Sequence, residues 1–234
     1  MKPIIVFDLG GVLIDWNPRY LYRKLFTDEP HMEFFLREVV SSKWNHQMDT
    51  GKSQDVSVEE LTRACPQYRD AIIAWMTRCD EMLGDAIETM PKVLQYFSRK
   101  SYELHAITNW SAETFHFAEK KYDFLKLFKT ITVSGREKVA KPNPIIFEIF
   151  LERHQLKASN CIFIDDDPRN IKSAYSMGFE TIHFTKPADC IRELEDKIGD
   201  QGLLQFIEEE VNVPRSENSE SANSATKTKF TKSR

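Results

Sequence analysis

Five short runs of mainly apolar and β-branched residues are spread along the chain, and helical patterns separate the later ones. The runs are Ile4–Phe7, Glu103–Ile107, Thr130–Val133, Cys161–Ile164 and Thr181–Phe184. Helical patterns cover Pro144–His154 and Ile171–Met177, for example. Strands that alternate with helices are typical of a parallel sheet covered by helices on both faces. The sequence therefore predicts an α/β fold with a doubly wound parallel sheet.

The first two runs are separated by a long segment, residues 15–84, that reads almost wholly as helix. The helical stretches expected there are Arg19–Phe26, Met32–Val40, Leu61–Ala64 behind a capping box of Ser57 and Glu60, and Arg69–Leu83. An insertion of this kind predicts a separate helical cap, able to close a site and exclude water. We therefore expect a core of residues 1–14 and 85–212, a cap of residues 15–84, and a disordered tail of residues 213–234.

Charge and composition exclude several classes of partner. A net charge of −4 gives no footprint for nucleic acid or for an anionic membrane surface. No apolar stretch approaches the roughly 20 residues of a membrane span, and the first residues become acidic too soon for a signal peptide. The 4 cysteines have neither metal-type nor redox-type spacing, which favours reduced thiols. These observations predict a cytoplasmic protein that binds neither nucleic acid nor membrane, and they leave its oligomeric state open.

Unusual polar residues lie in the loops that follow four of the β-type runs. They are Asp8, the pair Thr108 and Asn109, Lys141, and the sequence Asp165-Asp166-Asp167. Ligands in open α/β sheets bind beyond the carboxyl ends of the strands, so these side chains are expected to converge at one edge. Leu9, Gly10 and Gly11 come directly after Asp8 and suit a backbone cradle for an anion.

The converging residue types indicate phosphate chemistry. Adjacent carboxylates near Asp8 need a cation, and oxygen ligands without histidine or cysteine favour Mg²⁺. Asp8 is a candidate nucleophile that would form an acyl phosphate, with the Thr108 hydroxyl and the Asn109 amide as phosphate donors and Lys141 as a compensating charge. Asp165 suits either a further metal contact or a structural hydrogen bond. Asn170 is expected to orient Lys141 or a metal-bound water.

From Lys2 to about Phe206 the chain resembles the haloacid dehalogenase superfamily, with all four family motifs in order. The resemblance implies a Rossmann-like core with a mobile cap, an aspartate nucleophile at Asp8, and phosphate contacts from Thr108 and Lys141. It also implies Asp166 and the Gly10 carbonyl as metal ligands, beside Asp8. The helical insertion lies where the family's helical cap enters the core.

Gly10 departs from the pattern of typical phosphatases of the superfamily, which carry a second aspartate there as general acid and base. Such a group contributes roughly 10²–10⁴-fold to the rate. Three consequences follow as alternatives. The substrate has a leaving group that needs little protonation, another acid such as Asp15 or His46 substitutes, or the chemistry is not phosphoryl transfer.

We therefore expect a Mg²⁺-dependent phosphatase that acts on a small phosphorylated metabolite, for example a sugar 1-phosphate, through an aspartyl-phosphate. Two alternatives are a metal-independent 2-haloacid dehalogenase, which would also lack the second aspartate, and a catalytically silent binding member of the fold. The stretch Trp44–Asp49 in the cap suits either recognition of the leaving group or a helix packed within the cap.

Overall fold

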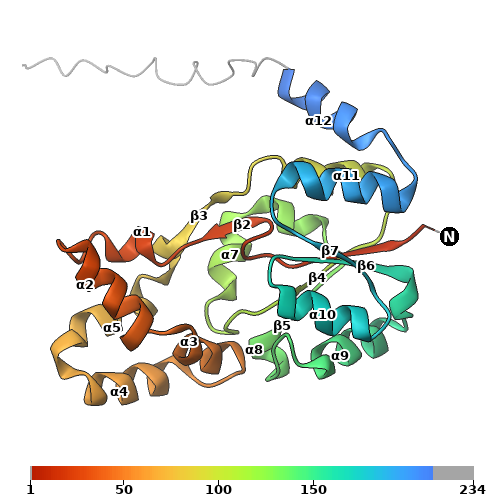
Figure 1. The fold of residues 1–234 in the computed structure, drawn as a ribbon. Coiled ribbons are helices and arrows are strands. Elements are labelled where there is room, and N and C mark those ends of the chain that lie inside the picture. The colour runs from red at the N-terminus through yellow and green to blue at the C-terminus, as the bar shows by residue number, and fades with distance from the viewer. Residues whose placement is uncertain (1, 213–234) are drawn as a thin grey trace, which may run out of the picture.

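The structure is a computed structural model that describes residues 2–212, with side chains to residue 209. The tail expected at residues 213–234 lies outside the described residues. A five-stranded sheet forms the centre of the larger part of the molecule (Figure 1). Its strands, in chain order, are β1 (Ile4–Phe7), β4 (Leu104–Thr108), β5 (Thr130–Val133), β6 (Cys161–Asp165) and β7 (Glu180–His183).

All neighbouring strands of this sheet are parallel, in the spatial order β5-β4-β1-β6-β7. The predicted doubly wound, Rossmann-like sheet is therefore confirmed, with strand limits within one residue of those expected. The chain builds outward from β1 on one side and then crosses to the other side to add β6 and β7. The crevice at such a reversal, beyond the carboxyl ends of the strands, is where ligands bind in open α/β sheets.

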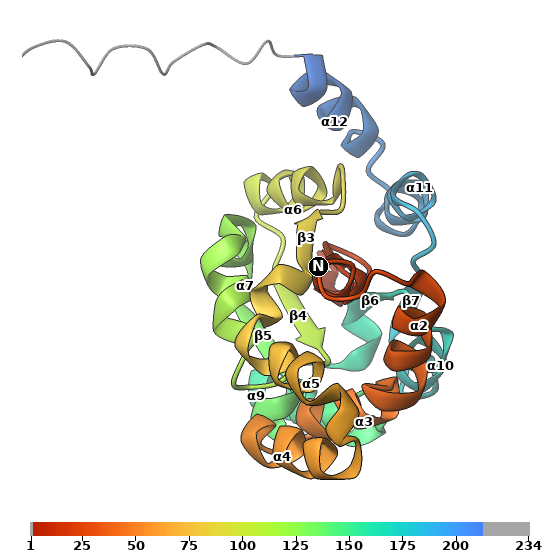
Figure 2. The same ribbon diagram turned by 90° about the vertical axis from the view of Figure 1, so that its left-hand side faces the viewer.

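Alternate residues of β1 belong to different hydrophobic clusters, because successive side chains of a strand point to opposite faces. Ile5 and Phe7 pack in one cluster with α6 (Met90–Arg99), α7 (Phe115–Lys121), α11 (Pro187–Ile198) and α12 (Leu203–Asn212). Ile4 and Val6 pack in the other with α9 (Pro144–His154) and α10 (Pro168–Ser176). Figure 2 shows the helices on both sides of the sheet. Burial on both faces explains the continuous apolar strands of the sequence.

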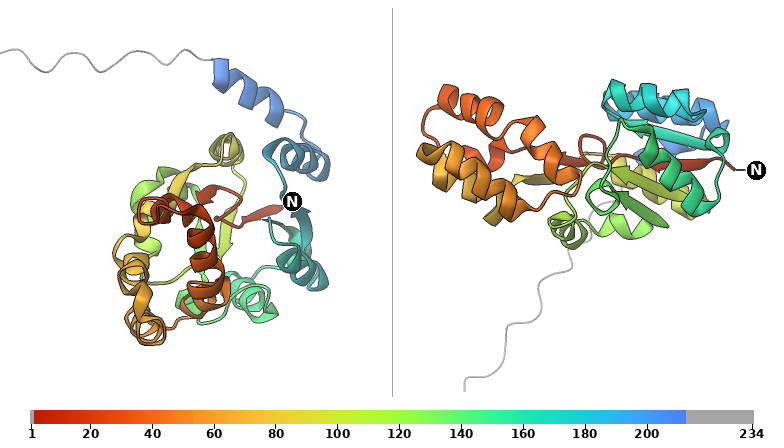
Figure 3. Two further views of the ribbon diagram at one scale, coloured as in Figure 1. Left: turned by 60° about the vertical axis from the view of Figure 1, so that its left-hand side comes forward. Right: turned by 90° about the horizontal axis from the view of Figure 1, so that it is seen from below.

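The cap has a hydrophobic cluster of its own, built from the helices between the first two sheet strands. These are α1 (Arg19–Tyr22), α2 (Glu29–Phe34), α3 (Ser42–Asp49), α4 (Gln54–Ala64) and α5 (Arg69–Thr77). A π-helical turn, Phe35–Val39, continues α2, and 3₁₀ turns cover Pro66–Tyr68 and Cys79–Met82. Figure 3 shows this helical part standing beside the sheet. The remaining short helices are α8 (Ser134–Glu137) and the 3₁₀ turns Asp123–Leu127 and Ala158–Asn160.

The expected capping box in the cap was wrong. Helix α4 begins at Gln54, three residues before the predicted cap at Ser57. Ser57 is fully buried inside the helix, and its hydroxyl donates to the Ser53 carbonyl at 2.8 Å. A buried serine whose hydroxyl donates to the backbone carbonyl oxygen four residues back satisfies that hydroxyl without capping the helix.

Two short strands were missed, β2 (Ile14–Trp16) and β3 (Leu83–Ala86), which pair antiparallel at the base of the cap. They form the two chain crossings between core and cap. The expected domain limits at residues 14/15 and 84/85 therefore fall inside this ribbon. Among residues 2–212 no helix is long and apolar enough to cross a bilayer, and all four cysteines are free thiols.

We predict that Phe35→Ala destabilises the cap by about 3–5 kcal/mol, the usual loss for a buried phenylalanine. Phe35 is fully buried and its ring lies 5.0–5.2 Å from the rings of Tyr22, Phe26 and Tyr68. Amide hydrogen exchange should show lost protection in the cap helices, with β1 and β4 still protected, because the cap cluster is separate from both sheet clusters. Phe34→Ala is the matched control, since Phe34 is 44% exposed. Equal loss of protection in the sheet would contradict a separate cap core.

Candidate active site

The polar residues expected to converge do meet at the carboxyl edge of the sheet. Carboxylate oxygens of Asp8, Asp165 and Asp166 lie within 4.8 Å of one another. Asp8 follows β1, Asp165 ends β6, and Thr108 ends β4, the strand on the other side of β1. Lys141 enters the group from the loop before α9.

Lys141 is the cation of this cluster, and its side chain is almost completely buried. Its Nζ lies 2.9 Å from Asp8 Oδ1 and 2.7 Å from Asp165 Oδ2, and it donates to the Ile107 carbonyl at 2.7 Å. These contacts account for the donors of one ammonium group. Burial alone would lower the pKa of Lys141, but the carboxylates of Asp165 and Asp8 outweigh it and hold the pKa above its usual value. The ammonium is therefore charged at neutral pH.

Asp165 serves mainly to hold Lys141 in place. It is fully buried, and both its oxygens also receive hydrogen bonds from the Asn170 amide, at 3.0 and 3.1 Å. The Asp167 N–H adds a further bond at 2.8 Å. Of the two roles left open by the sequence, the hydrogen bonds favour the structural one. Asn170 thus orients Lys141 indirectly, through Asp165.

Asp8 presents one oxygen to the protein and the other to the site. Its Oδ1 accepts from the Leu9 N–H at 2.7 Å and lies against Lys141, whereas Oδ2 receives no hydrogen bond from residues 2–209. Burial raises the pKa of Asp8 and Lys141 opposes this rise. The N–H of Leu9 orients the carboxylate in this structure, so its contact with a phosphate stays a prediction.

The two glycines after Leu9 differ in whether the structure requires a glycine at that position. Gly11 has φ +77°, and a Cβ there would lie 2.5 Å from Asp166 Oδ2. Its N–H donates to the Ile14 carbonyl at 3.0 Å, so it is engaged in the turn. A Cβ at Gly10 would meet nothing within 4 Å. The position that lacks the second aspartate is therefore open space on the cavity side.

Thr108 and Asn109 follow β4 beside Asp8. The Thr108 hydroxyl makes no hydrogen bond within the described chain and lines the cavity, as a phosphate donor must. The Asn109 amide instead clamps the backbone of Lys141, with Oδ1 accepting from its N–H and Nδ2 donating to its carbonyl, both at 2.9 Å. The side chain of Asn109 is therefore a positioning group, and its contact with phosphate remains a prediction.

The donor set fits a hard divalent cation. Asp8 Oδ2 is free, and Asp166 is an exposed carboxylate whose pKa is raised by partial burial and by Asp165. The Asn170 Oδ1 atom is buried without a hydrogen-bond partner, which is unusual for a polar atom. Oxygen ligands of this kind suit Mg²⁺. Asp8, Asp166 and the Gly10 carbonyl would hold such an ion, and Asn170 Oδ1 would accept from a water beside it.

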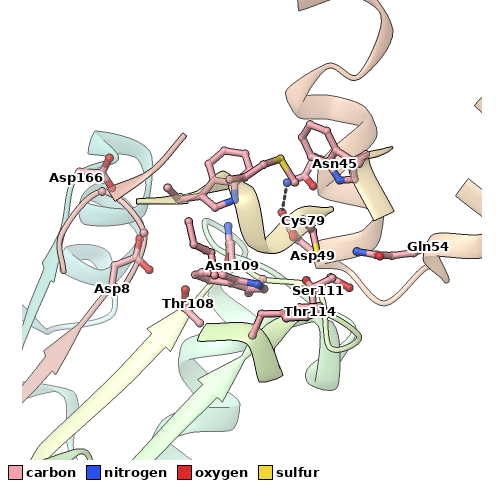
Figure 4. Close-up of a pocket in the computed structure, with 18 residues that line it drawn as sticks. Asp8, Asn45, Asp49, Gln54, Cys79, Thr108, Asn109, Ser111, Thr114 and Asp166 are labelled. Atoms are coloured by element: carbon pink, nitrogen blue, oxygen red, sulfur yellow. Dashed lines mark hydrogen bonds between the residues drawn. The ribbon is translucent and has the colours of Figure 1, made fainter. Parts of the chain in front are cut away.

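A cavity of about 300 Å³ lies between this cluster and the cap (Figure 4). Three polar residues of the cap reach it: Asn45 and Asp49 from α3, and Gln54 from the start of α4. Only the stretch Trp44–Asp49 had suggested such a role. The structure confirms that part of it packs as a helix within the cap, and its recognition of the leaving group stays a prediction. Trp44 and Met48 pack in the cap cluster, while Asn45 and Asp49, four residues apart, face the cavity.

The surrogate acids considered from the sequence lie elsewhere. His46 is exposed on α3 and Asp15 bonds to the Tyr20 hydroxyl, and neither lines the cavity. Gln54 was missed because a glutamine at the start of a helix carries no distinctive sequence signal.

A carboxylate-centred site at the edge of a Rossmann-like sheet, under an inserted helical cap, defines an α/β enzyme with a cap. The model of the haloacid dehalogenase-like hydrolase family matches residues 5–184, and the chain belongs to that family.

Several known proteins are similar to this chain. Acyl-CoA dehydrogenase family member 10 of Mus musculus is 25% identical over 211 residues, which are 83% of this chain and 19% of the mouse protein. The chain thus spans about a fifth of that relative. The sesquiterpene phosphatase astK of Aspergillus oryzae is 25% identical over 195 residues, 83% of this chain and 95% of the fungal protein. A haloacid dehalogenase family enzyme of Bacteroides thetaiotaomicron, solved as a magnesium complex, superposes with a TM-score of 0.64 at 20% identity, covering 82% of this chain and 98% of that one.

We predict that Asp49→Asn stabilises the protein at pH 8 and not at pH 4. Burial raises the pKa of Asp49 from 3.8 to about 7, so the folded state favours the neutral acid. Stability conferred by Asp49 is complete below pH 4 and declines as the pH rises to about 7. The neutral amide escapes this loss, and we expect a gain of about 1–4 kcal/mol at pH 8.

Urea unfolding at the two pH values measures the difference. Asp55→Asn, an exposed acid on α4, is the control and should change little at either pH. An Asp49→Asn variant that is equally destabilised at pH 4 and pH 8 would show that Asp49 is not held neutral by burial.

Proposed function

We propose that the protein is a Mg²⁺-dependent phosphatase that hydrolyses a small phosphorylated metabolite through an aspartyl-phosphate at Asp8. The observation that carries the proposal is the Asp8 carboxylate, held on one oxygen by Lys141 and Leu9 and free on the other. Similarity to the fungal sesquiterpene phosphatase and to the magnesium-bound bacterial enzyme supports it.

Asp8 Oδ2 would attack phosphorus, forming the bond to Asp8 as the bond between phosphorus and the leaving oxygen breaks. Water then cleaves the acyl phosphate and restores the carboxylate. Mg²⁺, when bound, would neutralise charge between the carboxylates and the phosphate dianion. The Thr108 hydroxyl donates to a phosphoryl oxygen, and the Lys141 ammonium offsets the negative charge of the transferring group.

Positioning accounts for the rest of the network. Lys141 is fixed at its backbone by Asn109 and at its ammonium by Asp165, which Asn170 holds in turn. A charged group whose partners are set before substrate arrives needs no reorganisation during the reaction. Catalysis of phosphoryl transfer depends mainly on such positioning and on electrostatic stabilisation, because the other side chains form no covalent bonds.

The open space at Gly10 restricts the leaving group. Position 10 carries no acidic side chain to protonate the departing oxygen, although a Cβ at Gly10 would meet nothing within 4 Å. The substrate class that fits is one whose leaving group departs with little protonation, such as a sugar 1-phosphate or an acyl phosphate.

The acidic cluster weighs against the alternative of a 2-haloacid dehalogenase. The carboxylate of a haloacid would face Asp8, Asp165 and Asp166 with only Lys141 to balance them, and like charges at this distance repel strongly. A silent binding member of the fold would have no need of a nucleophile oxygen left free beside a fixed ammonium. Turnover with Mg²⁺ separates that alternative from both enzymes.

We predict that Asp8→Asn lowers hydrolysis of acetyl phosphate by about 10⁴-fold or more, because an amide cannot take the phosphoryl group. Removing divalent cations with EDTA should stop hydrolysis by the native protein, and added Mg²⁺ should restore the activity. Phosphate release measures both effects, and hydroxylamine-sensitive phosphorylation should be found on Asp8. Asp196→Asn, exposed on α11, is the matched control and should retain activity. Activity that survives in Asp8→Asn, or in EDTA, refutes the proposal.

We also predict that Gly10→Asp speeds hydrolysis of an alkyl ester such as propyl phosphate by about 10²-fold, relative to acetyl phosphate. The new side chain enters open space and supplies the missing acid. Gly10→Asn is the isosteric control, which fills the same space without an acid. If the two variants change the ratio of the two rates equally, protonation of the leaving group does not limit this enzyme.

A further inference from the structure

The cavity between core and cap has two polar ends of different character. Asp8, Asp166 and Thr108 lie at the core end, and Asn45, Asp49 and Gln54 lie on the opposite side (Figure 4). The aromatic side chains of Trp16, Trp75, Trp110 and Phe117 also line the cavity, together with the polar residues Asn109, Ser111 and Thr114. A phosphate bound at Asp8 would therefore direct its organic group past aromatic walls toward three polar side chains of the cap.

Asn45 and Asp49 form a pair at the end of α3. They are four residues apart and thus on one helix face, and Asn45 Nδ2 donates to Asp49 Oδ2 at 3.0 Å. Asp49 is 9% exposed, and its other oxygen, Oδ1, receives no hydrogen bond from residues 2–209. One oxygen of a nearly buried carboxyl group is therefore still available in the cavity.

Gln54 adds a second group with unused hydrogen-bonding capacity. The residue is 4% exposed, and its backbone N–H donates to the carboxylate of Glu113. In the part of the chain that the structure describes, its side-chain amide makes no hydrogen bond, although it lines the cavity. Buried polar side chains are nearly always hydrogen-bonded, to protein or to something else. The free amide of Gln54 points to a bound molecule.

Two contacts with the core fix where these groups stand. Gly51 packs so closely on α8 that a Cβ there would lie 2.9 Å from Lys138 Cγ and 3.2 Å from the Gly135 carbonyl. The second contact is the bond from Gln54 to Glu113, which precedes α7. The turn between α3 and α4 is therefore docked on the core, and the span from Asp8 to the polar cap residues is set by packing.

Burying the carboxyl group of Asp49 also lowers the stability of the folded protein. Desolvation by burial is the only cause that acts on its pKa, which rises to about 7, and no cation offsets it. An apolar residue at this position of the cap would avoid that penalty. Groups that natural proteins retain at a loss of stability cluster at functional sites.

We infer that Asn45, Asp49 and Gln54 form a subsite that recognises a hydroxyl-bearing leaving group, the sugar part of a sugar 1-phosphate. The inference rests on the proposed function, because it takes the phosphate to lie at Asp8. It assigns to these three residues the selection of substrate and assigns the chemistry to the core.

The chemistry of the subsite selects hydroxyl groups over other leaving groups. The amides and the carboxyl group offer donors and acceptors together, which matches a hydroxyl, itself both donor and acceptor. A purely apolar chain would leave all three groups unpaired, at a penalty for each. An ammonium group would need Asp49 in its charged form, which burial disfavours. Aromatic walls are compatible with the C–H faces of a sugar ring.

The experiment compares two phosphate esters of similar ring size, a hexose 1-phosphate and phenyl phosphate, which carries no hydroxyl. The native protein should have the lower KM for the hexose ester. Asp49→Ala and Gln54→Ala should each raise that KM by about 10- to 100-fold, the usual loss for one buried hydrogen-bond partner. Neither should change kcat/KM for phenyl phosphate by more than about twofold. Asp49→Asn, which keeps a donor and an acceptor, should recover most of the affinity.

Asp55→Ala is the matched control, an exposed acid next to Gln54 on the same helix. Thermal unfolding shows whether each variant is folded. If Asp49→Ala does not fold, Gln54→Ala still tests the subsite. Equal losses on both esters, no loss on either, or a native preference for phenyl phosphate or for an amino-alkyl phosphate would overturn the subsite while leaving Asp8 as nucleophile. Failure of the native protein to hydrolyse phenyl phosphate and acetyl phosphate would overturn the proposed function, and the subsite with it.

Discussion

One buried ammonium group holds this site together. Lys141 Nζ bonds to Asp8 after β1, to Asp165 at the end of β6, and to the Ile107 carbonyl in β4. An ammonium this deeply buried is tolerated only when carboxylates and carbonyl oxygens satisfy it. The requirement fixes the ends of three adjacent strands relative to one another. Removing either carboxylate would leave the ammonium with one hydrogen-bond acceptor fewer, so the orientation of Asp8 and the integrity of the strand ends depend on the same contacts.

Much of the core end of the site could be predicted from the sequence, because two local signals determine it. Apolar runs such as Ile4–Phe7 locate the parallel strands, and parallel strands bring their carboxyl ends to one edge. Asp8, Thr108 and Asp166 then meet whatever the details of packing. The role of Asp165 could not be decided in that way. Its choice between metal and lysine depends on where the Lys141 ammonium lies, and that position is set by the clamp of Asn109 on the loop.

Two features could not be predicted from the sequence, for a different reason. They are the ribbon of β2 and β3 and the cap end of the cavity. Leu83-Gly84-Asp85-Ala86 has little strand propensity, and it pairs with residues about 70 positions earlier in the chain. Similarly, the pattern of α3 shows which face is apolar but not what its polar face meets. Asn45 and Asp49 became cavity residues only through the docking of the neighbouring Gly51 on α8.

The two ends of the cavity surround a buried carboxyl group with different partners. At the core end, burial raises the pKa of Asp8, and the Lys141 ammonium beside it opposes that rise. At the cap end, Asp49 has an amide neighbour and no cation, so burial favours its neutral form. A fixed cation beside the carboxyl group suits the proposed transfer of a phosphoryl group, and a neutral carboxyl group suits the proposed recognition of hydroxyls. Gly10 lines the cavity between the core end and the cap end, and the absence of a side chain there leaves that space open. The absent acid at Gly10 and the retained Asp49 are therefore consistent with the proposed function, in which the core would activate the phosphate and the cap would select the leaving group.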